Sequence, residues 1–594
     1  MATIKTIEKL DCLFIHASAD INYEGSCTMG MAMGVFALAD SLKRRGYSVR
    51  IIHTGIEKVL DNNFSLIEYL KFREVRLIAI SLHWYFQSAN SMKLVEQIKS
   101  SYPHVKIVLG GFTASFFAQE IMRNFKHVDF VIQGDGEIPI VKLAENVFSS
   151  KPDFSSVPNL AWRDNHKVIR NEHSYVANEK QISKLNFSNF NLMNNFATYA
   201  KVSPELSEYS KEALCRFSTF FLFVGRGCPV NCSFCGGSRI SQKIINGRDK
   251  VIFRSSGEVL KTIQDAAAAG IDCLYVCFDP DPQKKYYIEL FSLLRKSKIS
   301  ISMVFECWSL PSRKFIAAFQ KTFGKGQYSK LVLSPDTGSE RLRRLNKGFF
   351  YTNKELVDTL IYLKGRNIRF DIYFGYPMPY ENARDAELTY KFIKLLKQKT
   401  AGCGEVVIRN FGFDPASPMF LAPKKYNVAR RIKHFSDYCD NKKIQAYLAR
   451  TKGGASLRKS KHYSFRISHL LIKARWLFRL GCYKEAIEMG QMAKELIGDR
   501  PHYSLFYEKA NTHLLLGLSY ERSGQYKKAL RYSLEAIALN PGSGAAHNNA
   551  AIAYYYQKKY DLAIRHCDKA LQLGYAVSPQ FIEYLRPHRN TDRP

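Results

Sequence analysis

The 594-residue sequence lacks several features, and each absence excludes a class of protein. No apolar run approaches the ~20 residues that a membrane helix needs, so we expect no membrane span. The first residues, MATIKTIEKLDCLF, lack the order of charged, apolar and small residues that marks a signal peptide. Ten of the thirteen cysteines are scattered singly, which is not the spacing of a disulfide framework. These absences together predict a cytoplasmic protein in a reducing compartment.

Acidic residues are scarce beside basic ones: 53 Asp and Glu against 87 Lys and Arg give a formal net charge of +34. Part of the excess lies in residues 421–480, which hold sixteen basic and two acidic residues. A basic surface can attract nucleic acid, acidic peptides or anionic lipid. No nucleic-acid-binding motif accompanies the stretch, so we interpret it as a solvated face or a general basic bias and expect no nucleic-acid partner.

The most informative pattern is the run GRGCPVNCSFCGGS, in which Cys228, Cys232 and Cys235 are separated by three and then two residues. Cys thiolates at short fixed spacings hold iron–sulfur clusters, because one loop must wrap one cluster. A four-iron cluster needs four ligands, so three cysteines leave one iron open to another molecule. A zinc knuckle is the alternative, but zinc usually requires a second short pair of Cys or His, and none follows.

Residues 1–150 alternate strand-like and helix-like runs, the former being DCLFI, VRII, LIAIS, KIVLGG and DFVIQG. This alternation predicts a doubly wound, flavodoxin-like parallel sheet. Such a sheet binds ligands beyond the carboxyl ends of its strands. The residues at those ends are therefore candidates for a binding site: Ser81, His83, Gly110, Gly111, Gly134 and Glu137. Residues 151–214 are predicted to be a linker, and the alternation resumes in residues 215–425.

The last part of the chain, residues 466–585, is predicted to be all helical and repetitive, after a basic linker at 426–465. A 34-residue period with small residues at fixed places is the tetratricopeptide pattern. Stacked helix pairs of this kind form a concave binding face. We therefore expect about three repeats and a protein or peptide partner, or dimerisation; a plain helical bundle is the alternative. The recurring residues are Tyr526, Ala529 and Ala536, then Tyr560, Ala563 and Ala570.

The cysteine run, with Phe234 directly before the last cysteine, resembles the signature of the radical S-adenosylmethionine (SAM) superfamily. The resemblance implies a [4Fe-4S] cluster on Cys228, Cys232 and Cys235, with SAM on the open iron. One electron, from a donor such as flavodoxin or ferredoxin, then cleaves SAM to a 5′-deoxyadenosyl radical. It also implies an open (β/α)₆ barrel over residues 215–425, with the chemistry at the carboxyl ends of its strands. The SAM contacts that it implies are Phe234, Asp279, Asp336, Ser339 and Gly375.

The first 150 residues resemble the cobalamin-binding domain often fused ahead of radical SAM barrels. The resemblance implies that Ser81, Gly110, Gly111, Gly134 and Glu137 line the cobalamin pocket. The motif Asp-x-His-x-x-Gly, whose His coordinates cobalt, is missing: the nearest match is DINYEG at residues 20–25, with Asn in place of His. We expect no lower-ligand His, and we interpret His83 as a pocket or surface residue. A degenerate flavodoxin-like fold without a cofactor is the alternative.

Together the two resemblances cover roughly residues 10–425. They imply a cobalamin-dependent radical SAM enzyme that transfers a methyl group to a weakly activated carbon or phosphorus centre. No catalytic residue is assigned beyond the cluster loop. One alternative is ring closure or rearrangement without methylation. Another is a repeat-based interaction protein with a vestigial enzyme core, against which the intact cysteine triad argues. The sequence leaves the substrate and the oligomeric state open.

Overall fold

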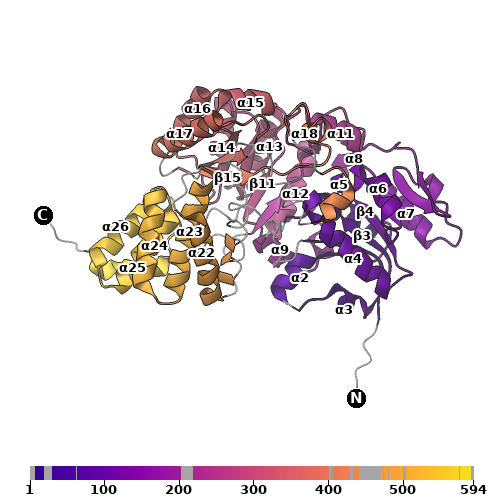
Figure 1. Ribbon diagram of the computed structural model, residues 1–594, viewed down its shortest axis with the longest axis horizontal. Coiled ribbons are helices and arrows are strands. Elements are labelled where there is room, and N and C mark those ends of the chain that lie inside the picture. The colour runs from indigo at the N-terminus through magenta and orange to yellow at the C-terminus, as the bar shows by residue number, and fades with distance from the viewer. Residues whose placement is uncertain are drawn as a thin grey trace, which may run out of the picture.

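The structure is a computed structural model with two α/β units and a helical region. It describes residues 7–18, 30–202 except 62, 218–428 except 377, 401, 402 and 405, 432–440, 443, parts of 467–478, 481–498, 503–573 and 575–589. In Figure 1 the first unit lies on the right in indigo and violet, the second lies at the top, and the helical region lies on the left in orange and yellow. None of the helices in these ranges has the length and apolar character needed to cross a membrane.

A seven-stranded sheet forms the centre of the first unit, with the order β2-β1-β3-β4-β5-β6-β7. The first five strands are parallel, and their order 2-1-3-4-5 is that of flavodoxin-like sheets, as predicted. The last two pair antiparallel at the edge, so the expected linker adds strands to this sheet. The strands are β1 (Glu8–His16), β2 (Val49–His53), β3 (Arg73–Ser81), β4 (Lys106–Gly110), β5 (Phe130–Ile132), β6 (Leu160–Asp164) and β7 (Lys167–Arg170).

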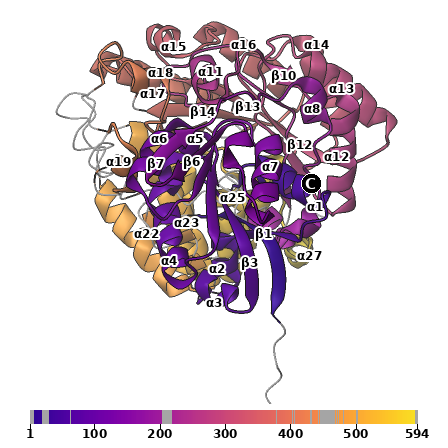
Figure 2. The same ribbon diagram turned by 90° about the vertical axis from the view of Figure 1, so that its right-hand side faces the viewer.

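Helices cover both faces of this sheet, because successive side chains on a strand point to opposite faces. Phe14 belongs to the core that packs under α1 (Gly34–Lys43) and α7 (Glu137–Phe148). Its neighbours Leu13 and Ile15 belong to the core on the other face. The helices of that face are α3 (Leu66–Leu70), α4 (Ser88–Ser101), α5 (Phe112–Phe116) and α6 (Ala118–Asn124). Figure 2 looks onto this unit, with the helical region behind it.

Six parallel strands form the sheet of the second unit, in the order β15-β14-β13-β12-β11-β8. Spatial order follows chain order, so β8 and β15 are the edges of an open α/β sheet with helices between strands. The strands are β8 (Thr219–Phe221), β11 (Cys273–Val276), β12 (Ser302–Cys307), β13 (Lys330–Asp336), β14 (Phe370–Tyr376) and β15 (Val406–Asn410). The helices are α12 (Ser256–Ala268), α13 (Lys285–Lys296), α14 (Arg313–Phe323), α15 (Glu340–Asn346), α16 (Asn353–Gly365) and α17 (Ala383–Lys399).

The cysteine loop follows the first strand of this unit. It lies between β9 (Gly225–Arg226) and α11 (Arg239–Asn246), and β9 pairs antiparallel with β10 (Ile252–Phe253). Helix α11 begins after Ser238, whose hydroxyl accepts the N–H of Ser241, and ends at Gly247 with φ +62°. A polar cap at the start and a left-handed glycine at the end are what the sequence needs to limit this helix to eight residues.

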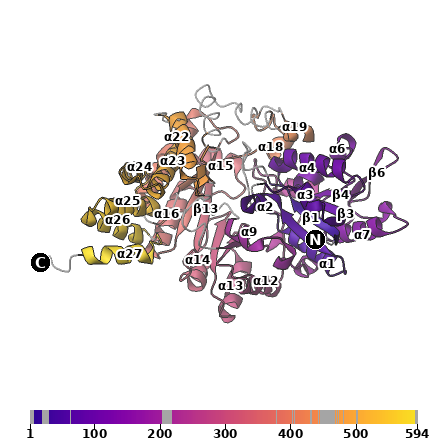
Figure 3. The same ribbon diagram turned by 90° about the horizontal axis from the view of Figure 1, so that it is seen from below.

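Beyond β15 the chain crosses back to the first unit. The short helices α18 (Pro418–Leu421) and α19 (Phe435–Cys439) pack there, and α19 contacts α4. Phe420 and Phe435 join the core of the first unit beside Phe117. Figure 3 shows both short helices beside α4 and α6. The described part of the expected basic linker therefore packs against the first unit and connects it to the second.

The C-terminal region is helical, as predicted. Each helix packs against the next, and α23 also contacts α17 and β15 of the second unit. Small residues allow this close packing: a Cβ on Gly517 of α23 would lie 2.9 Å from the Ser533 hydroxyl of α24. The helices are α22 (Tyr483–Ile497), α23 (Tyr503–Arg522), α24 (Tyr526–Leu539), α25 (Gly544–Tyr556), α26 (Tyr560–Gln572) and α27 (Pro579–Leu585).

Candidate functional site

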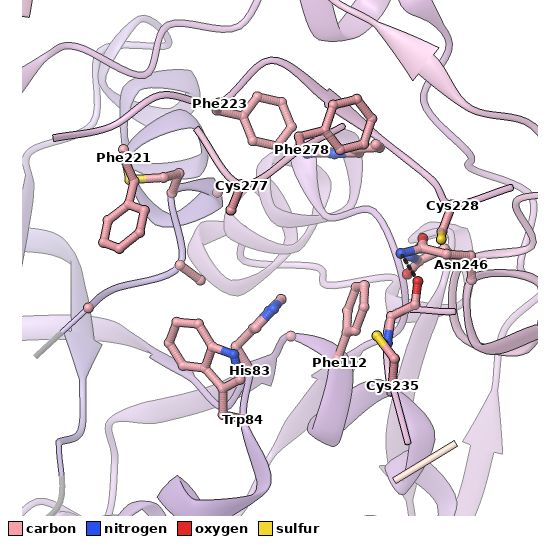
Figure 4. Close-up of a pocket in the computed structure, with 18 of the residues that line it drawn as sticks. His83, Trp84, Phe112, Phe221, Phe223, Cys228, Cys235, Asn246, Cys277 and Phe278 are labelled. Atoms are coloured by element: carbon pink, nitrogen blue, oxygen red, sulfur yellow. Dashed lines mark hydrogen bonds between the residues drawn. The ribbon is translucent and has the colours of Figure 1, made fainter. Parts of the chain in front are cut away.

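A cavity of about 890 Å³ lies between the carboxyl ends of the strands of the two sheets. The first unit contributes the ends of β3 and β4 and the turn before α7, and the second contributes the cysteine loop and the ends of β11 to β15. Figure 4 shows the thiols of Cys228 and Cys235 on one side of this pocket and His83 and Trp84 on another. Parallel α/β sheets bind ligands at this edge, so the cavity lies where both sheets expect a ligand.

One arm of the cavity runs into the first unit, between its sheet and the helices α1 and α7. Its walls are apolar: Phe14, Ala79, Val108 and Ile132 from four neighbouring strands, and Val35, Leu38 and Ile140 from the two helices. Protein interiors are normally packed without voids larger than a water molecule. A channel of this kind inside a core is therefore better explained as the binding site of an elongated ligand group than as a structural feature.

The double glycine after β4 opens the mouth of this channel. A Cβ on Gly110 would meet no atom within 4 Å and would project into open space. Gly111 has φ +107°, and a Cβ there would lie 2.8 Å from both Cα of His83 and the carbonyl oxygen of Leu82. Only glycine fits the second position, because other residues rarely adopt this conformation. Ser81, at the end of β3, lines the same opening.

His83 is a half-buried residue of the cavity wall. Its ring lies against Phe112 at 4.7 Å between centroids and against Trp84 at 4.9 Å. Burial lowers the pKa of His83 to about 4, so the ring is neutral at pH 7. The backbone N–H groups of His83 and Trp84 both donate to the Gln87 side chain at 3.1 Å. These contacts fix the two rings at the cavity wall, in agreement with the interpretation of His83 as a pocket residue.

The turn of residues 134–137 also lines the cavity, and its acidic side chains point toward the second unit. Glu137 and Asp135 form ion pairs with Arg226, the last residue of β9. Burial alone would lower the pKa of Arg226, but these two carboxylates raise it above its ordinary value. Gly134 has φ +71° and donates its N–H to the Ser115 hydroxyl at 2.9 Å. Glu137, which was predicted to line a cobalamin pocket, lies at the cavity, but its carboxylate is paired with Arg226.

The three cysteines of the loop line the cavity as free thiols. The N–H of Gly348 donates to Sγ of Cys232, and that of Gly237 donates to Sγ of Cys235, each at 3.3 Å. Burial raises the pKa of Cys228 to about 11. In the described part of the chain, no three Cys, His, Asp or Glu side chains gather where one metal ion could bind. Three thiols facing one cavity, with N–H groups on two sulfurs, fit an iron–sulfur cluster better than a single zinc ion.

Three of the five predicted SAM contacts lie at the cavity: Phe234, Asp336 and Gly375. Phe234 stacks on Phe411, with 3.9 Å between ring centroids and 19° between ring planes. A Cβ on Gly375 would lie 2.1 Å from the Phe411 ring, so this glycine makes room for that aromatic side chain. Phe411 lines the cavity as well, and the sequence analysis missed it. Its position directly after the sixth strand was the signal.

The other two predicted SAM contacts do not line the cavity. Asp279 is fully buried, pairs with Nζ of Lys284 at 2.9 Å and accepts the Trp308 N–H at 2.8 Å. Burial raises the pKa of Asp279 to about 6, although Lys284 acts to lower it. Ser339 caps α15, accepting the N–H of Leu342, and donates its hydroxyl to Asp385 at 2.6 Å. The contacts of both residues are structural.

The barrel side of the cavity contains further polar and aromatic residues that the sequence analysis did not single out. The Tyr275 hydroxyl donates to Oε2 of Glu306 at 2.9 Å, and both residues line the cavity. Cys277, Phe278 and Trp308 lie at the ends of the same strands. All of these residues belong to strand ends, so the pattern that identified Ser81 and Asp336 could have found them.

Two comparisons with protein families cover the two α/β units. Residues 29–144 match the B12 binding domain family, and residues 222–393 match the radical SAM superfamily. The matches confirm both predicted domains and, with them, cobalamin and SAM as the cofactor classes. Both matched segments contribute strand ends to the walls of the cavity.

Two curated proteins show what kinds of enzyme the chain is similar to. It is 25% identical over 169 residues to the cobalamin-dependent radical SAM methyltransferase TokK of Streptomyces tokunonensis, which is 27% of this chain and 22% of TokK. It is 19% identical over 206 residues to the anaerobic magnesium-protoporphyrin IX monomethyl ester cyclase of Synechocystis, 34% of this chain and 37% of the cyclase. The chain thus matches well under half the length of either relative.

The fold is shared with a solved structure. The radical SAM methyltransferase TsrM from Kitasatospora setae, whose structure contains cobalamin and a [4Fe-4S] cluster, aligns with a TM-score of 0.52. The alignment covers 72% of this chain and 80% of TsrM, at 13% sequence identity. At this identity the likeness shows a common fold and no more.

Proposed function

We propose that the protein is a cobalamin-dependent radical SAM methyltransferase. The observation that carries the proposal is one continuous cavity, which joins the apolar channel of the first unit to Cys228, Cys232 and Cys235 of the second. Cobalamin bound in the channel and SAM bound at the cluster would face each other across this space. The domain matches and the likeness to TokK, a cobalamin-dependent radical SAM methyltransferase by name, support the same reading.

In this proposal the cofactors supply the difficult chemistry: cobalamin carries the methyl group, and the reduced cluster delivers the electron that cleaves SAM. The chain supplies binding and orientation. Cys228, Cys232 and Cys235 would hold iron, and the N–H groups on two of the sulfurs favour their thiolate forms. Lys347 adds a positive charge beside Cys232, which acts to lower its pKa against the effect of burial. The external electron donor would be a flavodoxin or a ferredoxin.

The first unit would hold cobalamin by shape. Gly110 leaves space at the mouth of the channel, and Gly111 lets the chain turn away from it. Phe14 and Ala79 line the channel where an elongated nucleotide group would lie. His83 and Trp84 form the wall beside this opening, with their rings in edge contact. We propose no cobalt ligand from the chain, in line with the missing Asp-x-His-x-x-Gly motif.

The acceptor would bind on the barrel side of the cavity, beside Tyr275 and Glu306. The hydrogen-bonded pair is a polar group among aromatic residues such as Phe278 and Trp308. Pockets of mainly apolar lining with a few fixed polar groups orient a substrate by those groups. The acceptor in this proposal is a weakly activated carbon or phosphorus centre, because radical chemistry is needed only for such atoms.

We also propose that the helical region is a tetratricopeptide array that binds a protein or peptide. Ala529 and Ala536 of α24 and Ala563 and Ala570 of α26 are all buried, 34 residues apart in pairs. This is the spacing at which the repeat requires small residues. The array lies against α17 and β15, so a bound partner would be held close to the barrel.

A second candidate is ring closure or rearrangement without methylation. The similarity to the magnesium-protoporphyrin IX monomethyl ester cyclase favours it, because that relative carries the name of a cyclase. The same cavity and cysteine loop would serve both reactions, and only the fate of the substrate radical differs.

The test is anaerobic reconstitution with iron, sulfide and hydroxocobalamin, followed by assay of candidate acceptors for 5′-deoxyadenosine and S-adenosylhomocysteine. A methyltransferase of this type forms both products; 5′-deoxyadenosine alone supports the second candidate. Cys232→Ala is expected to reduce bound iron to background and to abolish both products. Cys403→Ala, a half-buried cysteine outside the loop, is the matched control and keeps its iron. Full iron content in the Cys232 variant would overturn the proposal.

A further inference from the structure

We propose that the turn of residues 134–137 couples the two cofactor sites, so that cobalamin and the cluster bind cooperatively. Asp135 and Glu137 are positioning residues in this proposal, and they act through Arg226 and Arg248. The inference rests on the proposed function, because it requires both cofactors. The resemblance seen in the sequence implies that Gly134 and Glu137 line the cobalamin pocket; a role of this turn in joining the two sites goes beyond it.

The turn binds the chain on both sides of the cysteine loop. Arg226 lies two residues before Cys228, and its guanidinium pairs with Glu137 and, through Nη1 at 2.8 Å, with Oδ1 of Asp135. Arg248 lies just beyond α11, the helix that follows the loop, and pairs with the other carboxylate oxygen of Asp135. One turn of the first unit therefore holds the entrance and the exit of the segment that would wrap the cluster.

These ion pairs are buried. The side chains of Asp135 and Glu137 are 5% exposed, that of Arg248 is 4% exposed and that of Arg226 is 15% exposed. Arg226 bridges two carboxylates and Asp135 bridges two arginines, and such buried ion pairs depend strongly on geometry, since a displaced partner leaves a buried charge unpaired. A shift of the turn is therefore transmitted to both arginines rather than absorbed by solvent.

The segment after β7 makes further hydrogen bonds to the ion-pair network. Ala177 donates its N–H to Oδ2 of Asp135 and accepts from Nη1 of Arg248, both at 2.9 Å. The Tyr175 hydroxyl donates to Oε2 of Glu137 at 3.5 Å. The segment after β7 thus closes around the ion pairs, and the carboxylates have few other positions to adopt.

The same turn lines the cofactor cavity with all four of its residues. Gly134 and Gly136 line the cavity, and a Cβ on Gly134 would lie 2.6 Å from Nε2 of His173. Arg226 lines the same cavity, so a ligand in the channel of the first unit would contact the turn whose acids hold both ends of the cysteine segment. Coupling between two sites is a free energy shared by both, so each ligand must raise the affinity of the other by the same factor.

The experiment measures the dissociation constant of hydroxocobalamin by anaerobic absorbance titration of the full chain, once with the cluster reconstituted and once iron-free. In the wild type we expect tighter binding with the cluster, by at least ~5-fold, the lower end of common coupling factors. Arg226→Lys, which loses the forked donor, and Glu137→Gln, which keeps size but not charge, should bring this ratio close to one. A second readout is the change that hydroxocobalamin causes in the electron paramagnetic resonance spectrum of the reduced cluster.

The matched control is Arg163→Lys. The Arg163 guanidinium donates to the backbone carbonyls of Met122 and Phe125 at 2.8 Å, all inside the first unit and away from the cysteine loop. This variant loses similar hydrogen bonds and should keep the wild-type ratio. A fall in the ratio for the control would mean that general loosening, not the turn, sets the coupling.

Three outcomes would overturn the inference. The dissociation constant of hydroxocobalamin could be the same with and without the cluster in the wild type. The Arg226 and Glu137 variants could also keep the wild-type ratio of the two dissociation constants. Glu137→Gln could also weaken hydroxocobalamin equally with and without iron, which would make Glu137 a direct cobalamin contact. Failure of the wild type to bind iron or cobalamin at all would instead overturn the proposed function, and the inference with it.

Discussion

Two buried ion pairs at strand ends of the second unit have nearly the same chemistry but different surroundings. Asp279 follows β11 and pairs with Lys284 at 2.9 Å, both side chains being 0% exposed. Asp336 ends β13 and pairs with Lys347 at 2.7 Å, both being 9% exposed. Only the second pair lines the cavity. The position of an acid at a strand end therefore does not decide whether a ligand can contact it.

The difference comes from the turn that follows each strand. Lys284 has φ +52°, and its amino group lies over Asp279 while it also donates to the Ser309 hydroxyl at 2.9 Å. These contacts enclose the Asp279 side chain, although other residues at the end of β11 line the cavity. Lys347 follows a complete helix, α15, and lies beside Asp336 and Cys232, so the end of β13 stays open to the cavity. We propose that Asp279–Lys284, the closed pair, has a structural role and that Asp336–Lys347, the open pair, acts at the candidate site.

The largest expected effect is the loss of stability when the closed pair, Asp279 and Lys284, is broken. Lys284→Met would leave the Asp279 carboxylate buried without its partner, which costs about 3–5 kcal/mol of the free energy of unfolding. Urea unfolding measures this loss, and SAM affinity of the reconstituted protein should not change. The double variant Lys284→Met with Asp279→Asn should recover part of the stability. A large loss of SAM affinity at unchanged stability would place Asp279 at the site after all.

The closed pair should also give a pH dependence. Burial raises the pKa of Asp279 to about 6 from the ordinary value of 3.8, so the folded state holds this proton more tightly than the unfolded state. Stability from this group is therefore fully present below pH ~4 and is lost as pH rises through ~6, by up to roughly 3 kcal/mol. Unfolding of wild type and Asp279→Asn at several pH values measures it: the difference in their stability should change over this window. A difference that is constant with pH would contradict the assignment.

For the open pair we expect an effect on the ligand. Asp336→Asn removes the carboxylate that faces the cavity and takes away the charge partner of Lys347. SAM affinity should fall about 10-fold, equivalent to about 1.4 kcal/mol. The change in the electron paramagnetic resonance of the reduced cluster on SAM addition measures the affinity. Asp279→Asn is the matched control, and an equal shift in both variants would remove the distinction between the pairs.

The smallest effect concerns Ser339, which, like the closed pair, does not line the cavity. Ser339→Ala removes the cap of α15 and the hydrogen bond to Asp385, at a cost of about 1 kcal/mol of stability. SAM affinity should stay at the wild-type value. Ser339→Thr, which keeps a capping hydroxyl, should restore most of the stability. If Ser339→Ala weakened SAM while Ser339→Thr did not, the hydroxyl would have a role at the site.

The sequence predicted the parts of the site that depend on local spacing. Cys228, Cys232 and Cys235 lie at the cavity, as do Ser81 and Gly110 at their strand ends. Strand ends of a parallel sheet share one edge, so alternation of strands and helices suffices to place them there. The strands in segment 151–214 were not predicted. Strands β6 and β7 are short and pair at an edge of the sheet, so neither contains a long buried apolar run that would indicate a strand.

The contacts that sequence could not predict join distant parts of the chain. Glu137 and Arg226 are 89 residues apart, and Asp135 and Arg248 are 113 residues apart. Nothing near Glu137 indicates that its partner is an arginine rather than a ligand. The same holds for Phe411, whose ring packs on Phe234 from the far end of the second unit. The two ion pairs follow from the docking of the two units, and the Phe234–Phe411 contact follows from the folding of the second unit; no local pattern encodes either.

The crossing segment with α18 and α19 has a consequence for how ligands enter. Phe420, Phe435 and Tyr438 are buried, and the N–H of Phe435 donates to Glu120 at 2.7 Å. Rotating one α/β unit away from the other as a rigid body would expose these aromatic rings to water, and burying such rings is worth a few kcal/mol each. The energy of burying these rings opposes separation of the two units, so we expect ligands to reach the cavity while the units stay docked.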